Sequence, residues 1–210
     1  GYCGAYMFKD AFEKLETQEI TILLEELNPL FDGVQYDLAE TTIMALDMSF
    51  YLGYRLLDIS SHVVMPPIQR YAIYKPGHAV IIDFTNEPLY ALNKNVPIQL
   101  TPENVGEYVH FFFSYVRGRH GRFLIVENVD DVNWKDDPPP SARKAMGKMI
   151  VPITLQSQEK DGGFKLTVSM MFKDSLFKSD VIITKTGHVS LENEELLVED
   201  MPVLDDTLGQ

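Results

Sequence analysis

Cysteine is nearly absent from this chain, which has a single such residue, Cys3, among its 210 positions. One thiol excludes both an intrachain disulfide and a metal site built from several cysteines. Because Cys3 lies so close to the N-terminus, we do not expect it to be held in place as a catalytic nucleophile.

Long apolar runs are missing as well. No stretch approaches the roughly 18 consecutive apolar residues that a membrane span requires, and no signal-peptide pattern begins the sequence. We therefore expect a soluble, cytoplasmic protein with no membrane partner. The chain starts with Gly1 rather than methionine, which leaves open a leader that has been removed.

Basic residues are few, at 18 lysines and arginines against 31 aspartates and glutamates, so the net charge is -13. Binding to a phosphate backbone depends on a positive surface, and we therefore expect no nucleic-acid partner. No basic residue follows Lys185, while acids accumulate there: Glu192, Glu194, Glu195, Glu199, Asp200, Asp205 and Asp206. We interpret this end of the chain as a frayed, solubilising acidic tail.

The short motifs of common catalytic and cofactor sites are also missing. The sequence has no phosphate-binding GxxxxGKS or GxxxxGKT loop, and no GxGxxG, HExxH, CxxC or GxSxG motif. These absences argue against nucleotide-dependent, zinc-protease and serine-hydrolase chemistry. We predict no cofactor.

What the chain does contain is a strong helical pattern in its middle, in a sequence that is 45% hydrophobic. Apolar side chains recur there at offsets of 0, 3, 4, 7, 8 and 11: Val105, Tyr108, Val109, Phe112, Phe113 and Val116. This spacing is typical of an amphipathic helix. Thr101 and Pro102 suit its first turn, and Gly118 suits a left-handed C-terminal residue. The sequence predicts a central helix over about 101–117.

A short apolar run, Phe123–Val126, follows this helix at once and predicts a buried strand. Helix and strand must fold back on each other through the turn at Arg119–Arg122. We expect the surrounding strands to pack over this aromatic helix.

The first hundred residues predict a mixture of helices and hairpins. The segment from Tyr6 to Glu16 and the segment from Thr17 to Pro29 carry helical spacing, although Ile20–Leu24 also suits a strand. The remaining elements are expected as follows: a turn at Asp32-Gly33, an ambiguous segment over Leu38–Leu46, a strand over Met48–Ile59, a hairpin around Lys75-Pro76-Gly77, and a second hairpin joining Pro88–Leu92 to Val96–Leu100.

Beyond the central unit the composition changes. Residues 130–148, with Pro138-Pro139-Pro140, predict a linker or a long surface loop, and we expect Trp134 to anchor it to the body. The region after Met149 alternates between polar and apolar residues, as in a β-meander with one covered face and one nearer water. Its expected strands are Ile150–Gln158, Phe164–Phe172, Leu176–Lys185 and His188–Leu191.

Together these patterns predict an α+β fold: antiparallel sheets packed on the central helix, with an N-terminal helical segment and a C-terminal β-meander. We expect an α+β region over 1–129, the proline-rich linker or loop over 130–148, and the meander with its acidic tail over 149–210. One composite domain is favoured over two.

The candidate ligand-binding site is the turn Arg117-Gly118-Arg119-His120-Gly121-Arg122. Guanidinium groups can hold a carboxylate or a phosphate by paired hydrogen bonds. The turn follows a helix C-terminus, whose dipole repels anions, so the arginines would have to act without its help. The competing interpretation, which we favour at this stage, is a capped turn whose arginines pair with the abundant acids.

The sequence predicts no metal site. No two of the five histidines have the spacing of helical metal ligands, and three or four ligands must converge on a metal. Asp58, Ser60, Ser61 and His62 contain the residue types of a catalytic triad, but neighbours in sequence do not have its geometry.

Two hypotheses for the function follow. The first is a non-catalytic binding or interaction protein, forming a homo-oligomer or holding a protein partner through its aromatic surface. The second is a small-molecule enzyme or anionic-ligand-binding protein that uses the Arg117–Arg122 turn. In that case Arg119 would clamp an anion, His120 would act as acid or base, and Asp83 would orient it.

Overall fold

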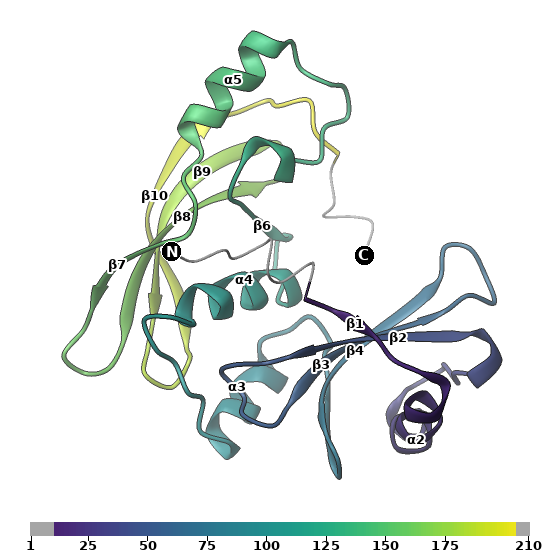
Figure 1. Ribbon diagram of the computed structural model, residues 1–210. Coiled ribbons are helices and arrows are strands. Elements are labelled where there is room, and N and C mark those ends of the chain that lie inside the picture. The colour runs from purple at the N-terminus through teal and green to yellow at the C-terminus, as the bar shows by residue number, and fades with distance from the viewer. Residues whose placement is uncertain (1–10, 205–210) are drawn as a thin grey trace. The chain divides into compact units, whose positions relative to one another are not determined.

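The computed structural model describes residues 11–204 (Figure 1). The contacts within the chain divide it into two compact units. The N-terminal unit runs to Asp83 and takes in Glu87–Gln99, and the C-terminal unit comprises Phe84–Asn86 and the chain from Leu100 onward.

The N-terminal unit is built on a five-stranded antiparallel sheet in the order β1-β2-β3-β4-β5. Its strands are β1 (Glu13–Lys14), β2 (Thr41–Asp47), β3 (Arg55–Ser61), β4 (Ile68–Lys75) and β5 (His78–Ile81). The hairpin expected around Lys75-Pro76-Gly77 is confirmed, since Lys75 pairs with His78 and Gly77 has a φ of 83°. That positive φ is what the third residue of a type II turn requires.

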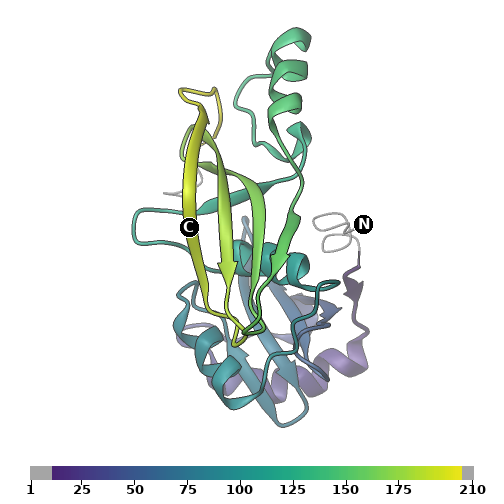
Figure 2. The ribbon, with the colours of Figure 1, turned by 90° about the vertical axis from the view of Figure 1, so that its left-hand side faces the viewer.

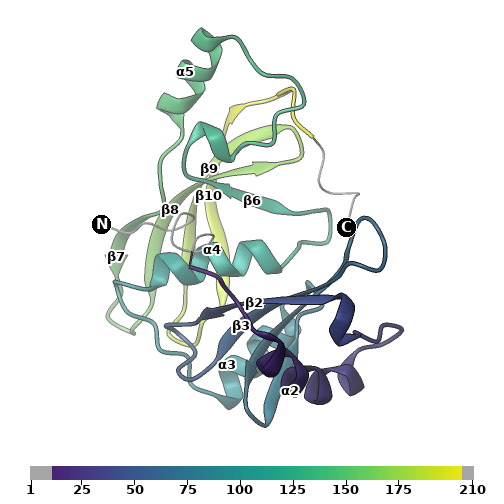
Figure 3. The ribbon, with the colours of Figure 1, turned by 45° about the vertical axis from the view of Figure 1, so that its right-hand side comes forward.

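One face of this sheet is covered by α2 (Thr17–Leu27), which is drawn beside its strands in Figure 3. The predicted inner residues, Ile20, Leu23, Leu24 and Leu27, are all buried in one cluster with strand residues such as Ile43 and Leu57. The helical interpretation of this segment is therefore confirmed, and the strand alternative over Ile20–Leu24 is excluded. Three short elements complete the unit: two 3-10 turns, Asn28–Leu30 and Leu38–Glu40, and α3 (Glu87–Asn95).

The C-terminal unit holds a second antiparallel sheet, in the order β10-β9-β8-β6, with β7 paired to β8 as well. Its strands are β6 (Phe123–Val126), β7 (Thr154–Gln158), β8 (Phe164–Phe172), β9 (Ser175–Ile183) and β10 (Val189–Val198). Figure 2 shows the last three side by side as a meander. Strand β6 pairs with the second half of β8 and β7 with the first half.

Helix α4 (Val105–Tyr115) packs against this sheet. Phe112 and Phe113 are each only 5% exposed, and the Phe113 ring meets the Phe123 ring of β6 edge-on at 6.3 Å. The fully buried Tyr108 donates its hydroxyl to the carbonyl oxygen of Gly187, between β9 and β10, at 2.5 Å. The predicted fold class, antiparallel sheet packed on a central helix with a C-terminal meander, is confirmed.

The opposite face of the sheet is buried as well, at one end. There Val126, Met171 and Leu176 form a second cluster with Val132, Ile150 and Met201. The expectation that the meander has one face near water is therefore wrong along much of β8, where Thr167, Ser169 and Met171 are all buried. The covering comes from 3-10 turn η3 (Val129–Asp131), Trp134 and the chain end, which local alternation does not reveal.

The central helix is shorter than predicted. It begins at Val105 because Thr101 and Asn104 bond each other's backbone N–H groups in the preceding turn, at 2.8 and 3.1 Å. It ends at Tyr115 because Val116 is already extended, with φ -122° and ψ 130°.

Near the N-terminus, part of the expected helix Tyr6–Glu16 lies outside the described residues. Within the described part, Glu13–Lys14 form β1, and the Leu15 N–H donates to the carbonyl oxygen of Ile43 at 2.9 Å. Pairing with β2 thus overrides the helical spacing of this segment.

Two further predictions in the first hundred residues are wrong. The expected long strand Met48–Ile59 begins only at Arg55, because Met48 and Tyr54 close a tight loop that buries both Phe50 and Tyr51. In place of the expected hairpin joining Pro88–Leu92 to Val96–Leu100, residues Glu87–Asn95 form helix α3, which buries Leu89 and Leu92, and residues 96–100 form no strand. Leu38–Leu46, left ambiguous, is a 3-10 turn followed by β2.

The segment expected as a linker is also partly ordered, since α5 occupies Pro140–Met149. Pro139 and Pro140 stand at its start, where missing N–H groups are tolerated. The anchoring role of Trp134 is confirmed: its indole N–H donates to the Val129 carbonyl oxygen at 3.3 Å, and its backbone bridges to Val203. The acids Glu192, Glu194 and Glu195 lie in β10 rather than in a frayed tail.

The aromatic surface expected to hold a partner stays a prediction, and within the described chain only half-buried rings could contribute to it. Between residues 11 and 204 every aromatic side chain is buried or half-buried. The exposed large hydrophobic side chains there are aliphatic, such as Leu52 and Met65.

The hydrogen bond from Tyr108 should make a measurable contribution to stability. Tyr108→Phe removes the hydroxyl and leaves the Gly187 carbonyl without that donor, so we expect the free energy of unfolding to fall by about 1 kcal/mol. Chemical denaturation of the two proteins measures this. An unchanged unfolding midpoint would show that the contact between α4 and the β9–β10 turn adds nothing to stability.

Candidate functional site

The turn that the sequence singled out is a tight two-residue connection. The Gly118 N–H donates to the Gly121 carbonyl oxygen at 2.8 Å, and the Gly121 N–H donates back at 3.2 Å. Arg119 and His120 stand at its tip, both exposed. The prediction that Gly118 is the left-handed residue is wrong: Gly121 has the positive φ, 138°, because the chain turns after the helix has already ended.

The three arginines of this turn lie in three different surroundings. The Arg117 guanidinium stacks on the Phe84 ring at 4.0 Å, and its backbone N–H donates to the Phe84 carbonyl oxygen at 2.9 Å. Arg119 is exposed at the tip, whereas Arg122 lines a pocket. Asp83, the carboxylate proposed to orient His120, is exposed and belongs to the N-terminal unit. Of the three arginines, only Arg122 lines the pocket described below.

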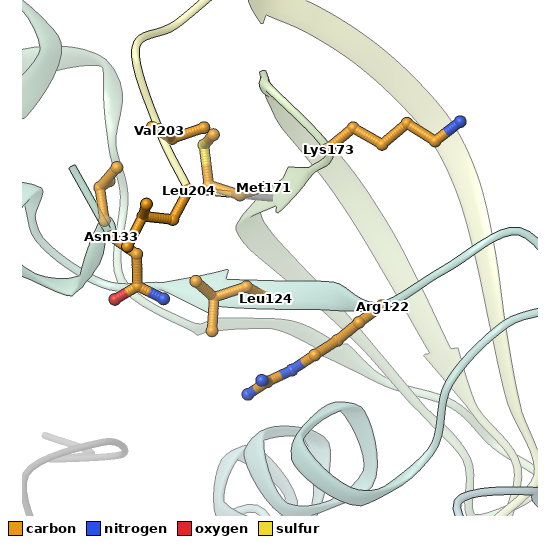
Figure 4. Close-up of a pocket in the computed structure, with 8 residues that line it drawn as sticks. Arg122, Leu124, Asn133, Met171, Lys173, Val203 and Leu204 are labelled. Atoms are coloured by element: carbon orange, nitrogen blue, oxygen red, sulfur yellow. The ribbon is translucent and has the colours of Figure 1, made fainter. Parts of the chain in front are cut away.

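The pocket beside Arg122 lies within the C-terminal unit (Figure 4). Its empty space is about 350 Å³, a figure that includes the open mouth. The lining residues are Arg122, Leu124, Val132, Asn133, Met171, Lys173, Val203 and Leu204.

Strand alternation places Arg122 and Leu124 on the pocket side of β6. Phe123 stacks on Phe172 of β8 at 4.8 Å, on the face that α4 covers. Because successive side chains of a strand point to opposite faces, Leu124 and its cross-strand partner Met171 face the other way. Arg122 directly precedes β6 and Lys173 directly follows β8, so both lie next to the paired ends of these two strands.

The second wall of the pocket is the end of the described chain. It is held by backbone hydrogen bonds: Met201 N–H to the Asp174 carbonyl oxygen at 2.9 Å, Lys135 N–H to that of Pro202 at 2.8 Å, and Leu204 N–H to that of Asn133 at 2.9 Å. These bonds fix Val203 and Leu204 against the sheet edge. Three stretches far apart in sequence thus meet at the pocket.

Arg122 is the polar group of most interest in this pocket. Its Nε is shielded from solvent and has no hydrogen-bond partner. Among the described residues no ion pair to Arg122 is formed, and no carboxylate lines the pocket. A shielded donor without a partner costs free energy, about 1–3 kcal/mol, and such a group in a folded protein calls for an explanation.

Lys173 lines the pocket with the aliphatic part of its side chain rather than with its ammonium group. Its ammonium lies 5.5 Å from the centre of the Phe172 ring. In Figure 4 the Lys173 side chain extends away from Leu124 and Leu204, whereas the Arg122 side chain extends in the direction of Leu124. One cation, that of Arg122, therefore serves the pocket.

Sequence reasoning found Arg122 but none of the other seven lining residues. Alternation along Arg122–Val126 was the only local signal, since it places Leu124 on the same side as Arg122. Asn133, Val203 and Leu204 carry no pattern that relates them to β6. Only the backbone pairing of the chain end to residues 133–135 does so.

A separate polar group lies on the sheet of the N-terminal unit. Ser60 and Gln69 both donate to the Asp58 carboxylate, at 3.4 and 3.3 Å, while His62 Nε2 is bonded to the Thr42 hydroxyl at 3.0 Å. Burial raises the pKa of Asp58 above its usual value, against the lowering effect of those two bonds. His62 does not bridge Ser60 and Asp58, so the arrangement is not that of a catalytic triad.

Two further features of residues 11–204 are the distribution of metal-ligating side chains and the length of the helices. Between residues 11 and 204 no three His, Cys, Asp or Glu side chains are grouped so as to hold a metal ion. No helix in the same range is long and apolar enough to cross a membrane. Comparisons of the chain with protein-family models, with curated proteins and with solved structures found no match.

If the unpaired Nε of Arg122 is costly, removing it should stabilise the ligand-free protein. Arg122→Met keeps an apolar stem of similar reach, and we expect its free energy of unfolding to rise by about 1 kcal/mol. The matched control is Arg119→Met, three residues away and exposed, which should change little. Denaturation of both variants is the measurement, and a loss of stability specific to Arg122→Met would show that the guanidinium has partners within the protein.

The raised pKa of Asp58 makes a prediction about pH. Because burial disfavours the ionised Asp58 carboxylate, this group lowers the stability of the folded protein. The full destabilisation is present above its folded pKa, and it disappears as the pH falls below the unfolded pKa, about 3.9. Asp58→Asn, which keeps both hydrogen bonds, should therefore stabilise the protein at neutral pH but not near pH 3. Thermal unfolding across this range tests it, with exposed Asp47→Asn as the control; an advantage independent of pH would contradict the prediction.

Proposed function

We propose that this protein is a non-catalytic binding protein that holds a small ligand in the pocket beside Arg122. The observation that carries the proposal is the composition of that pocket. Leu124, Val132, Met171, Val203 and Leu204 form its apolar wall, and one guanidinium supplies its charge. A mostly apolar concavity with a few polar groups is the usual character of a small-molecule site.

The absence of reactive groups from the lining favours binding over catalysis. The lining contains no His, Asp, Glu, Ser, Thr, Cys or Tyr, which are the usual side chains for proton transfer and nucleophilic attack. Lys173 is the one residue of that kind, and its ammonium lies over Phe172 instead. An arginine remains protonated and can orient or neutralise a ligand without exchanging protons.

The alternative, an enzyme that uses the Arg117–Arg122 turn, has less support. Arg119 and His120 are exposed, where water screens charges and competes for hydrogen bonds. Anion binding by this segment remains part of the proposal, but through Arg122 alone. A protein partner or a second copy of the chain is the other occupant we consider, and nucleic acid is disfavoured by the net charge of -13. We place the protein in the cytoplasm because of its single cysteine.

A ligand-observed NMR screen of small organic acids, amides and alcohols tests the proposal. We expect some of them to bind the wild-type protein and to bind Leu204→Ala several-fold more weakly, because part of the apolar wall is lost. Leu196→Ala is the matched control, since Leu196 is similarly exposed, at 49% against 54%, but lies in β10 away from the pocket.

The outcomes of this screen separate the alternatives. Binding that is equal in Leu204→Ala and Leu196→Ala would place the ligand elsewhere. Turnover of any bound compound, followed over hours by the same spectra, would contradict the non-catalytic assignment.

A further inference from the structure

We infer that the ligand of this pocket is a monocarboxylate with a short branched or linear apolar group, whose carboxylate pairs with the Arg122 guanidinium. This inference rests on the proposed function and narrows it to one chemical class. It draws on the charge, the geometry and the size of the pocket, taken in turn below.

The charge of the pocket contrasts with that of the whole chain. The protein has 31 acidic residues against 18 basic ones, yet the pocket lining has Arg122 and Lys173 and no acid. Elsewhere in the described chain basic groups do find acids: Arg55 pairs with Glu19 at 3.3 Å, and Arg143 pairs with Asp130. Among residues 11–204 Arg122 has no acidic partner, so its guanidinium is suited to an anion from outside.

The geometry favours a carboxylate with a single charge. A guanidinium offers parallel N–H groups that match the two oxygens of a carboxylate. Because Nε is shielded from solvent, the donor pair that an incoming carboxylate would meet is the one formed by the two Nη groups. Since the Lys173 ammonium lies over Phe172 and its side chain extends away from the pocket (Figure 4), a doubly charged phosphate would find only one cation.

The apolar wall and the small volume define the rest of the ligand. Leu124, Met171 and Leu204 offer aliphatic surface beside Arg122. The space of about 350 Å³ counts open solvent at the mouth and is therefore an upper bound on what the pocket encloses. The ligand must be small, with a short aliphatic group at most, and a nucleotide or an extended cofactor is too large.

Calorimetric titration with 4-methylpentanoate, its neutral amide 4-methylpentanamide, acetate and inorganic phosphate tests the inference on the full chain. We expect the acid to bind most tightly, the amide and acetate each to bind roughly tenfold more weakly or worse, and phosphate to show no saturable binding. Affinity for the acid should fall as salt is raised, since ion pairing is screened.

Variants of the same turn supply the controls. Arg122→Gln should weaken binding of the acid by roughly tenfold to a hundredfold, the range expected for a lost charged hydrogen bond, and leave the amide unaffected. Arg122→Lys keeps the positive charge but lacks the parallel N–H donors of a guanidinium, so its affinity for the acid should lie between those of the wild type and Arg122→Gln. Arg119→Gln removes an equal charge nearby and should bind as the wild type does. Thermal unfolding of each variant confirms that it is folded.

Each outcome decides between the two proposals. If the amide binds as well as the acid, or if Arg122→Gln binds the acid normally, the carboxylate inference is overturned and the proposed binding function stands. If neither 4-methylpentanoate nor its amide binds at millimolar concentration, the carboxylate inference is overturned, and the proposed binding function is overturned as well if no compound of the NMR screen binds. If phosphate binds more tightly than the acid and loses affinity in Arg122→Gln, the site takes phosphate rather than carboxylates.

Discussion

The contact between Phe113 of α4 and Phe123 of β6 is the interaction on which the C-terminal unit depends. The two rings meet edge-on, and Phe123 in turn stacks on Phe172 of β8. Aromatic pairs of this kind bury large apolar areas and fix relative orientation. Once Phe123 faces the helix, the period of two along a strand directs Arg122 and Leu124 to the opposite face. The face of the sheet on which the pocket lies is therefore set by the helix.

What closes that opposite face is the chain beyond β10, together with residues 132–135. The backbone bonds from Met201, Lys135 and Leu204 attach this segment to its neighbours, and Met201 enters the cluster that contains Val126 and Met171. The cluster reaches Leu124 of the edge strand β6 but not Arg122, beside which the pocket remains open. The pocket thus exists because apolar burial stops short of the Arg122 cation. If apolar side chains filled the pocket completely, the Arg122 guanidinium would be buried, and its desolvation would cost a large amount of free energy.

Local sequence features predicted much of the C-terminal unit. Strand β8 was predicted at its observed bounds, and α4 and β6 were predicted from their periodicity, with an error of a few residues at each end of α4. Two of the errors lie in the first hundred residues, where Met48–Tyr54 closes a loop and Pro88–Leu92 is helical. In both places short apolar runs suited either structure, and packing of Phe50, Tyr51 and Leu89 into the interior decided between them.

The sequence by itself determined the α+β class, the aromatic helix, the meander and the presence of an unusual cation-rich turn. These follow from side-chain period and from turn residues such as Pro76-Gly77, which act over a few positions. Only the tertiary structure put Arg117 on the Phe84 ring, left Arg119 exposed and placed Arg122 in a pocket lined by Leu124, Met171 and Leu204. Those neighbours come from segments that are dozens of residues apart, joined by strand pairing and by the backbone bonds of the chain end. No local pattern encodes which distant segment a strand edge will meet, because that is decided by how the whole unit buries its apolar surface.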